Sequence, residues 1–330
     1  MENTVTAPAK RCLPAAIGLF FIAPFIAEFL LGDLPITMLP VVLVLAPVYG
    51  GGALLIREVA RRTGGGWPAI VLMALAYGIV EEAFTTQSLF NPDYLHLHLH
   101  LLQPAFIPAL GIGGWWTIFV LTLHTAWSIS TSIALVEAAF PDRASMPWLG
   151  PIGLVLITLL FALGLVATTR YQLHQDPFRA SRAQFLISGS ICVALVILAF
   201  LLPKRGTAEE PGRVPNPWIT AAFALLAGST VLLTPGRWRW GAAALILAVD
   251  ACVAGLVLLW SRRRGWDMRH KLGLASGAAL AYGWHAFIGH PVVSGPLYVV
   301  RIGNGVFLLA VILLIYFGAR RTSAWVRGSI

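Results

Sequence analysis

The run Trp67-PAIVLMALAYGIVEEAFTTQSLF-Asn91 indicates the fold class of this chain and contains its most unusual feature. Apolar or small residues fill positions 67–80, and two adjacent carboxylates, Glu81 and Glu82, follow them. A run of this length and composition is typical of a helix that crosses a lipid bilayer. An ionisable group at bilayer depth is costly unless it is protonated, paired or hydrated. The pair therefore marks a candidate functional site inside the membrane.

The composition of the whole chain indicates the same class of protein. Of its 330 residues, 58% are hydrophobic and 11% are charged, whereas a soluble domain carries about 25% charged residues. The net charge of +9 does not indicate nucleic-acid binding, because Lys and Arg lie almost entirely between apolar runs, where they set topology. The three cysteines form no CxxC or His-Cys spacing, so neither a disulfide framework nor a zinc ribbon is predicted.

Apolar runs recur along the chain and predict an all-α, polytopic transmembrane helical bundle of about ten spans. The expected spans are 13–32, 36–56, 67–90, 114–140, 148–169, 184–203, 217–235, 240–261, 271–289 and 298–318. If the N-terminus is cytoplasmic, most of the 23 Lys and Arg fall in cytoplasmic loops, so both termini are expected in the cytoplasm.

The chain is predicted to form a single integral membrane domain over residues 1–330. Within it, a cytoplasmic linker at 204–216 is expected to separate a six-span part, 1–203, from a four-span part, 217–330. The expected location is the cell membrane, of a bacterial inner-membrane type, with the lipid bilayer as the surrounding partner.

Several ionisable residues fall within the expected spans. They are Glu28, Glu81, Glu82, Glu137, Asp250, His124 and His285. With a rise of about 1.5 Å per residue, Glu81, His124 and His285 are expected between the middle and the outer third of a core about 30 Å thick. An α-helical period also places Thr85 and Ser88 on the face of Glu81. Three helices are therefore expected to bring two carboxylates and two imidazoles together.

This set of side chains predicts hydrolysis within the membrane by one of two routes. Glu81 would take a proton from a water, Glu82 would tune it, and His124 and His285 would orient the water or stabilise the oxyanion. Alternatively, two imidazoles and a carboxylate would hold zinc with one position open for water, so zinc is the cofactor that the sequence allows. The substrate would be a membrane-embedded peptide or a small molecule.

The order Glu81-Glu82, His124, His285 on separate helices resembles the pattern of CPBP intramembrane proteases, the CAAX-prenyl-protease and bacteriocin-processing family. The motifs of that family are EExxxR, FxxxH, and HxxxN or HxxxD. The resemblance implies an all-helical, membrane-embedded fold with Glu81 as the water-activating base and the two histidines as those of the later motifs. Thr86, Val120 and Gly289 stand where the motifs have Arg, Phe, and Asn or Asp.

Two other interpretations of the same residues stay open at this point. Scattered intramembrane acids such as Glu28, Glu137 and Asp250 are typical of ion pathways, which would make the protein a proton-coupled transporter or permease. Alternatively, the polar residues form a non-catalytic network in which each is satisfied by a hydroxyl group or a backbone carbonyl.

The segment Tyr94-LHLHLHL-Leu102 carries a second candidate site in an expected external loop. In an extended segment, His96, His98 and His100 would share one face, as three ligands of an external zinc or copper ion. The alternative is an amphipathic segment that lies at the membrane interface.

Overall fold

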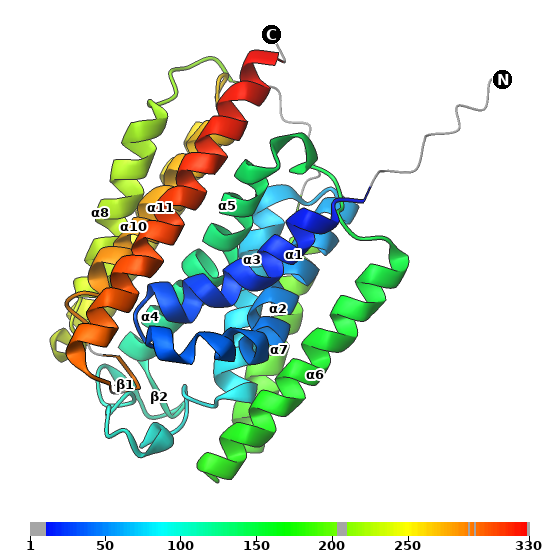
Figure 1. Ribbon diagram of the computed structural model, residues 1–330. Helices are drawn as coiled ribbons and strands as arrows, with labels where there is room; N and C mark the ends of the chain where they lie inside the picture. Colours follow the sequence, from blue (N-terminus) through cyan, green and yellow to red (C-terminus); the bar gives the residue numbers. More distant parts are fainter. Residues whose placement is uncertain (1–10, 203–209, 290, 294, 329–330) are drawn as a thin grey trace.

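The computed structural model describes residues 11–202, 210–289, 291–293 and 295–328, which form a bundle of long helices (Figure 1). The helical segments are α1 (Leu13–Pro24) continued by a π-helix (Phe25–Leu30), a 3-10 helix (Ile36–Val41) leading into α2 (Val42–Thr63), α3 (Gly66–Ile79) continued by a π-helix (Val80–Thr85), α4 (Gly114–Thr122), a π-helix (Leu123–Thr131) and α5 (Ser132–Ala139) in one span, α6 (Pro151–Gln175), α7 (Arg182–Leu201), α8 (Pro217–Leu233), α9 (Trp240–Ser261), α10 (Met268–His285) and α11 (Leu297–Gly328). Short 3-10 helices lie at Tyr94–His96, Pro141–Arg143 and Gly236–Trp238, and strands β1 (Phe106–Ile107) and β2 (Ile112–Gly113) form a small antiparallel hairpin.

The polytopic helical bundle predicted from the apolar runs is confirmed. Within the described part of the chain, 8 helices are long and apolar enough to cross a membrane, and α8 is a shorter apolar helix. These 8 helices lie at eight of the ten expected spans, whereas α8 and α10 lie at the seventh and ninth expected spans and are not among the 8. The start of α1 and the end of α11 lie at the same end of the bundle (Figure 1), as an even number of spans requires. Residues 203–209 of the predicted linker lie outside the described residues.

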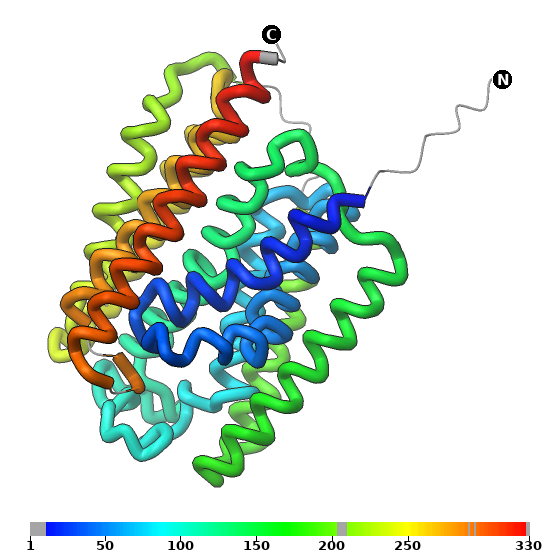
Figure 2. Tube along the Cα trace, in the orientation of Figure 1, coloured from blue at the N-terminus to red at the C-terminus, as the bar shows by residue number. Residues whose placement is uncertain are grey.

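The span formed by α4, its π-helix and α5 lies in the middle of the bundle. On one side it contacts α1, α2 and α3, which pack with α6 and α7; on the other it contacts α9, α10 and α11. Figure 2 shows the late helices as one group and the early helices as another, with this span between them. Two large apolar clusters correspond to the two groups, and both include residues of the central span.

The helices differ strongly in how much of their surface the protein covers. In α3 and its π-helix, 67% of the most apolar window is buried, whereas the figure is 11% for both α6 and α7. Apolar side chains that protein does not cover are stable only against lipid, so α6 and α7 are peripheral helices of the bundle. The segment that carries Glu81 and Glu82 is therefore an internal one, screened from lipid by its neighbours.

Close packing of α8 on α10 depends on small residues, among them Gly273 and Gly277, which are spaced four apart on α10. A Cβ atom on Gly277 would lie 2.1 Å from the carbonyl oxygen of Ala221 and 2.7 Å from the amide nitrogen of Leu225. A Cβ atom on Gly273 would lie 2.4 Å from the carbonyl oxygen of Pro217. These neighbours are backbone atoms, which cannot move aside as a flexible side chain can.

We expect Gly277→Val to destabilise the protein by about 1–3 kcal/mol or more, because the two helix axes must separate. Thermal unfolding in detergent, followed by circular dichroism, measures the effect. Gly255→Val in α9 is the matched control, since a Cβ atom there meets nothing within 4 Å. Equal melting temperatures for the two variants would show that α8 and α10 do not pack in this way.

Candidate active site

The structure brings Glu81, Glu82 and His124 into one buried cluster. Nε2 of His124 lies 2.7 Å from Oε1 of Glu82, and Nδ1 lies 3.4 Å from Oε2 of Glu81. The three residues are 5%, 7% and 6% exposed. Within the described part of the chain, His124 is the only ion-pair partner of either carboxylate. Residues 67–91 contain no lysine or arginine. The His124 imidazole is therefore the basic group that contacts both carboxylates.

Glu82 is the well-supported member of the pair. Its Oε2 accepts a short hydrogen bond from the hydroxyl of Ser88 and lies 3.0 Å from Oγ1 of Thr86. Trp116 donates from its indole nitrogen to the Ser88 oxygen at 3.0 Å. Glu81 differs, because its buried Oε2 has no close hydrogen bond within the described residues and faces the His124 imidazole at 3.4 Å and the hydroxyls of Tyr77 and Tyr49. The two adjacent carboxylates thus have unlike surroundings, and only Glu81 has an oxygen without a close hydrogen bond.

Local π-helical geometry places these side chains. The π-helix Val80–Thr85 holds the two glutamates, Leu123–Thr131 holds His124, and Phe25–Leu30 holds Glu28. A π-helical turn inserts an extra residue between hydrogen-bonded partners and recurs at functional sites. The predicted α-helical face was wrong for Ser88 because the helix ends at Thr85, and in the turn beyond it Ser88 contacts Glu82 rather than Glu81.

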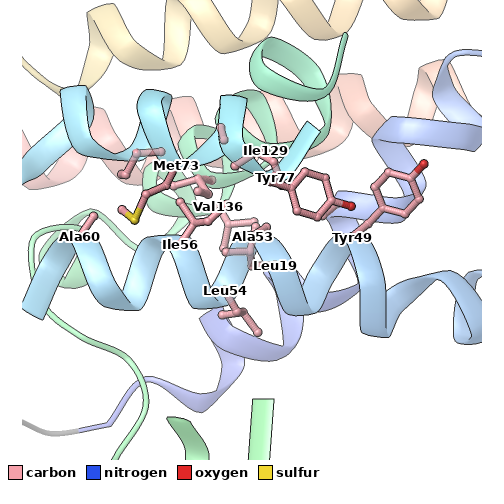
Figure 3. Close-up of a cluster of buried hydrophobic side chains, with 14 of the residues drawn as sticks. Leu19, Tyr49, Ala53, Leu54, Ile56, Ala60, Met73, Tyr77, Ile129 and Val136 are labelled. Carbon is pink, nitrogen blue, oxygen red and sulfur yellow. The ribbon is translucent and has the colours of Figure 1, made fainter. Parts of the chain in front are cut away.

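Two tyrosines and a third carboxylate complete the cluster, and the sequence interpretation did not assign them to it. Tyr49 of α2 stacks on the His124 ring with centroids 6.1 Å apart, and the Tyr77 ring lies edge-on at 5.9 Å. Figure 3 shows the two tyrosines next to each other, at the end of the apolar cluster around Met73. The Tyr49 hydroxyl donates to Oε1 of Glu28 at 2.5 Å. The Tyr77 hydroxyl is buried, makes no close hydrogen bond within the described residues, and faces the Glu81 carboxylate.

One of these additions had a sequence signal. Tyr77 precedes Glu81 by four residues, a spacing that puts two side chains on the same face of a helix. Tyr49 and Glu28 lie on other helices, and no periodicity within one segment can show that they face His124. Their part in the cluster follows from helix packing alone.

His285 is not brought to the glutamate pair by any described contact. It is the last residue of α10, its ring lies 6.2 Å from that of Trp284, and its Nδ1 is buried without a hydrogen-bond partner. The similar depth predicted for His124 and His285 did not make them neighbours. A site that uses Glu81, Glu82 and His124 therefore forms without the second imidazole.

The structure also does not bring together a metal-binding set of side chains. Among the described residues, no group of three or more His, Cys, Asp or Glu is placed to hold a metal ion. His96 and His98 both face Asp93, with Nδ1 to carboxylate distances of 3.5 Å and 3.0 Å, whereas Nδ1 of His100 lies 3.3 Å from Nε2 of Gln103. The three histidines of the loop thus do not converge on one point, and zinc has no cluster of ligands here.

The histidine-containing loop is fastened to the bundle through Asp176, which directly follows α6. Its Oδ2 accepts from the side-chain amide of Asn91 at 2.6 Å and from the backbone N–H of Leu95 at 3.0 Å. Burial acts to raise the pKa of Asp176, but the bonds from Asn91, Phe178 and Leu95 outweigh it and hold the pKa below its usual value. Asp176 is therefore an ionised anchor for the loop at neutral pH.

Glu137 belongs to a second, separate ionic network, which corrects its assignment to an ion pathway. Its carboxylate pairs with Nε of Arg57 at 2.9 Å and with Arg61 through two nitrogens, the closest contact being 2.7 Å. The side chains of Arg57 and Glu137 have no solvent exposure, and that of Arg61 is 6% exposed. Charges this closely paired are neutralised in place and are unsuited to relaying protons.

The same network fastens the loop after α5 onto α2. The Arg57 guanidinium lies 3.3 Å from the centroid of the Trp148 ring and donates to the carbonyls of Ala144 and Met146. Glu58, also fully buried, accepts from the backbone N–H of Trp148 at 2.6 Å. Every charge in this network has partners, which is the arrangement expected of a structural role.

Asp250 is the remaining intramembrane acid, and it lies apart from both clusters. Its Oδ2 accepts from Oγ1 of Thr122 at 2.7 Å. Of the acids that the sequence placed in spans, three gather around His124, one is neutralised by arginines and one contacts a threonine.

The fold and this cluster define a multi-pass helical membrane protein with a buried acid–imidazole site. A family model matches residues 19–325, and the chain belongs to that family, described as an uncharacterized membrane protein family. No curated protein and no solved structure matches the chain. The match confirms the predicted class and the location in a membrane.

Proposed function

We propose that the protein is an intramembrane hydrolase that cleaves an amide or ester bond, with Glu81 as the general base. The observation that carries this proposal is the pair of unlike carboxylates around His124. One oxygen of Glu81 is buried, has no close hydrogen bond within the described residues and lies 3.4 Å from the imidazole, as a site for a reacting water requires. Both Ser88 and His124 contact the Glu82 carboxylate, so Glu82 is not free to act as the base. Glu82 instead holds the imidazole in place.

Each group in the cluster has a role in the proposed reaction. Glu81 takes a proton from the water while the water oxygen bonds to the substrate carbonyl carbon. The resulting oxyanion accepts a hydrogen bond from the Tyr77 hydroxyl, which makes no close hydrogen bond to any described residue. The bond to the leaving amine or alcohol then breaks, and the leaving group takes the proton from Glu81. The products are a carboxylic acid and an amine or alcohol, and Glu81 is ionised again.

Two further points support hydrolysis over proton-coupled transport. The acids do not form a file across the bundle, because Glu137 is neutralised by two arginines and Asp250 contacts only Thr122 in the described hydrogen-bond network. The resemblance to CPBP proteases through Glu81, Glu82 and His124 implies the same chemistry. The peptidase expected from the sequence is one member of the proposed class, and His285 has no part in the proposed mechanism.

The test is a reaction in water enriched in ¹⁸O with the full-length protein in lipid nanodiscs. Quenched fluorescent transmembrane peptides and long-chain acyl esters serve as substrates, and mass spectrometry follows the products. We expect ¹⁸O in the new carboxylate of the product, and we expect Tyr77→Phe to lower the rate by about 10²–10³-fold through loss of the oxyanion donor. If neither substrate class is cleaved, or if Tyr77→Phe cleaves as fast as the natural protein, the proposal fails.

A further inference from the structure

A cavity of about 430 Å³ lies among α2, α3, α6 and α7, and it adjoins the polar cluster. Its wall includes Tyr77, whose ring also contacts His124, and Val80, which directly precedes Glu81. A Cβ atom on Gly52 would lie 2.5 Å from the Tyr77 ring. Because Gly52 has no side chain, the Tyr77 ring can form part of the wall. A molecule in the cavity would therefore contact the Tyr77 ring, and through this one side chain it would be separated from the buried Tyr77 hydroxyl and the His124 cluster.

The chemistry of the wall restricts what can occupy the cavity. All lining side chains are apolar except Tyr77 and Cys192, and the thiol of Cys192 contacts the carbonyl of Ala76 at 3.6 Å. No charged side chain lines the cavity. A peptide backbone would bring N–H and C=O groups that this wall cannot satisfy, at a cost of several kcal/mol for each group. A hydrocarbon chain carries no such groups.

The cavity is too small to enclose a second helix. Ten residues of an α-helix about 10 Å across occupy about 1,200 Å³, far more than the 430 Å³ present. A single extended chain has a much smaller cross-section. The cavity also lies on the side of the lipid-facing helices α6 and α7, so a chain can reach it from the bilayer without passing through water.

We infer that the substrate is a long-chain acyl lipid whose hydrocarbon chain occupies this cavity, with its ester or amide carbonyl at Tyr77 and Glu81. This inference rests on the proposed hydrolase function and names the substrate class of that same site. Burial of the hydrocarbon chain in the cavity provides the binding free energy and holds the substrate carbonyl next to Glu81. The apolar wall selects against short or polar substrates. Transmembrane peptides are then poor substrates.

The experiment measures binding and cleavage separately. Binding uses a hexadecanoyl ester with a diazirine at the chain end, photolysed with the full-length Glu81→Gln variant, which keeps the cavity but lacks the base. We expect labelling of the cavity wall near Val196 and Phe200, blocked by excess unlabelled hexadecanoyl ester and not by butanoyl ester. Val196→Trp fills the cavity and should lower labelling about tenfold or more.

Leu198→Trp is the matched control on the same helix, because Leu198 is 46% exposed and does not line the cavity; it should label normally. Labelling spread over all lipid-facing helices and not blocked by the hexadecanoyl ester overturns the inference. Saturable labelling without cleavage by the natural protein would support the binding site for the hydrocarbon chain and would contradict the proposed hydrolase function. Equal cleavage of hexadecanoyl and butanoyl esters, or cleavage of peptides alone, keeps the hydrolase and overturns the acyl-lipid assignment.

Discussion

Glu81→Gln is expected to lower the rate of hydrolysis by about 10²–10⁴-fold, the range that a positioned general base contributes. The amide keeps the shape of the side chain but cannot accept a proton from water. Stability should change little, because the variant loses only the 3.4 Å contact of Glu81 with His124, whereas the 2.7 Å contact of His124 with Glu82 remains. The measurement is single-turnover cleavage in nanodiscs, with melting temperature recorded on the same preparation.

The control for Glu81→Gln is Asp250→Asn, which also replaces an intramembrane carboxylate by an amide. Asp250 contacts Thr122, away from the His124 cluster, so its replacement should leave the rate within about twofold, corresponding to less than 0.5 kcal/mol. Equal losses in the two variants would mean that intramembrane charge in general, and not the base at Glu81, supports activity.

Glu137→Gln is expected to destabilise the protein by about 3–5 kcal/mol, because two guanidinium groups lose their carboxylate in a buried place. Arg57 and Glu137 have no solvent exposure in their side chains, so water cannot replace the lost partner. The amide oxygen can still accept hydrogen bonds, but the side chain carries no charge to balance Arg57 and Arg61. A loss of this size should lower the melting temperature by roughly 6 °C or more.

Asp142→Asn provides the comparison for this loss. Its side chain is 53% exposed and lies 3.4 Å from Arg143, an exposed pair of the kind that contributes about 0–1 kcal/mol. Both melting temperatures are measured by heating the detergent-solubilised proteins, and aggregation is followed in parallel. A Glu137→Gln variant as stable as Asp142→Asn would show that the buried network does not hold the loop after α5 on α2.

The two polar clusters are linked by the helices that carry them. Tyr49 and Arg57 both lie on α2, while His124 and Glu137 both lie on the central span. The Arg57–Glu137 pair and the contact of the Tyr49 ring with the His124 imidazole therefore join the same two segments of the bundle.

The helices could be predicted from the sequence because each apolar run is long enough to cross a bilayer by itself, and a single span must satisfy its own backbone hydrogen bonds. Glu81, Glu82 and His124 could be predicted as a set because ionisable groups at bilayer depth are costly and need partners. Those inferences use local properties, namely composition, length and depth along one helix.

The choice of neighbours could not be predicted in the same way. Depth along a helix gives one coordinate, whereas contact also depends on rotation about the helix axis and on which helices are adjacent. His124 and His285 share the first property, yet only His124 meets the glutamates. The end of the helix matters as well, because Ser88 lies in the turn after Thr85 and donates to Glu82 rather than Glu81.

The sequence by itself determined a polytopic helical membrane protein, its spans and the two acids that need a partner, because these follow from the free energy of apolar and charged groups in lipid. Tertiary structure alone decided that Glu28, Tyr49 and Tyr77 join His124, that Glu137 is neutralised by Arg57 and Arg61, and that an apolar cavity adjoins Tyr77. The physical reason is that these contacts join side chains far apart in the chain, and they exist only once the helices have packed.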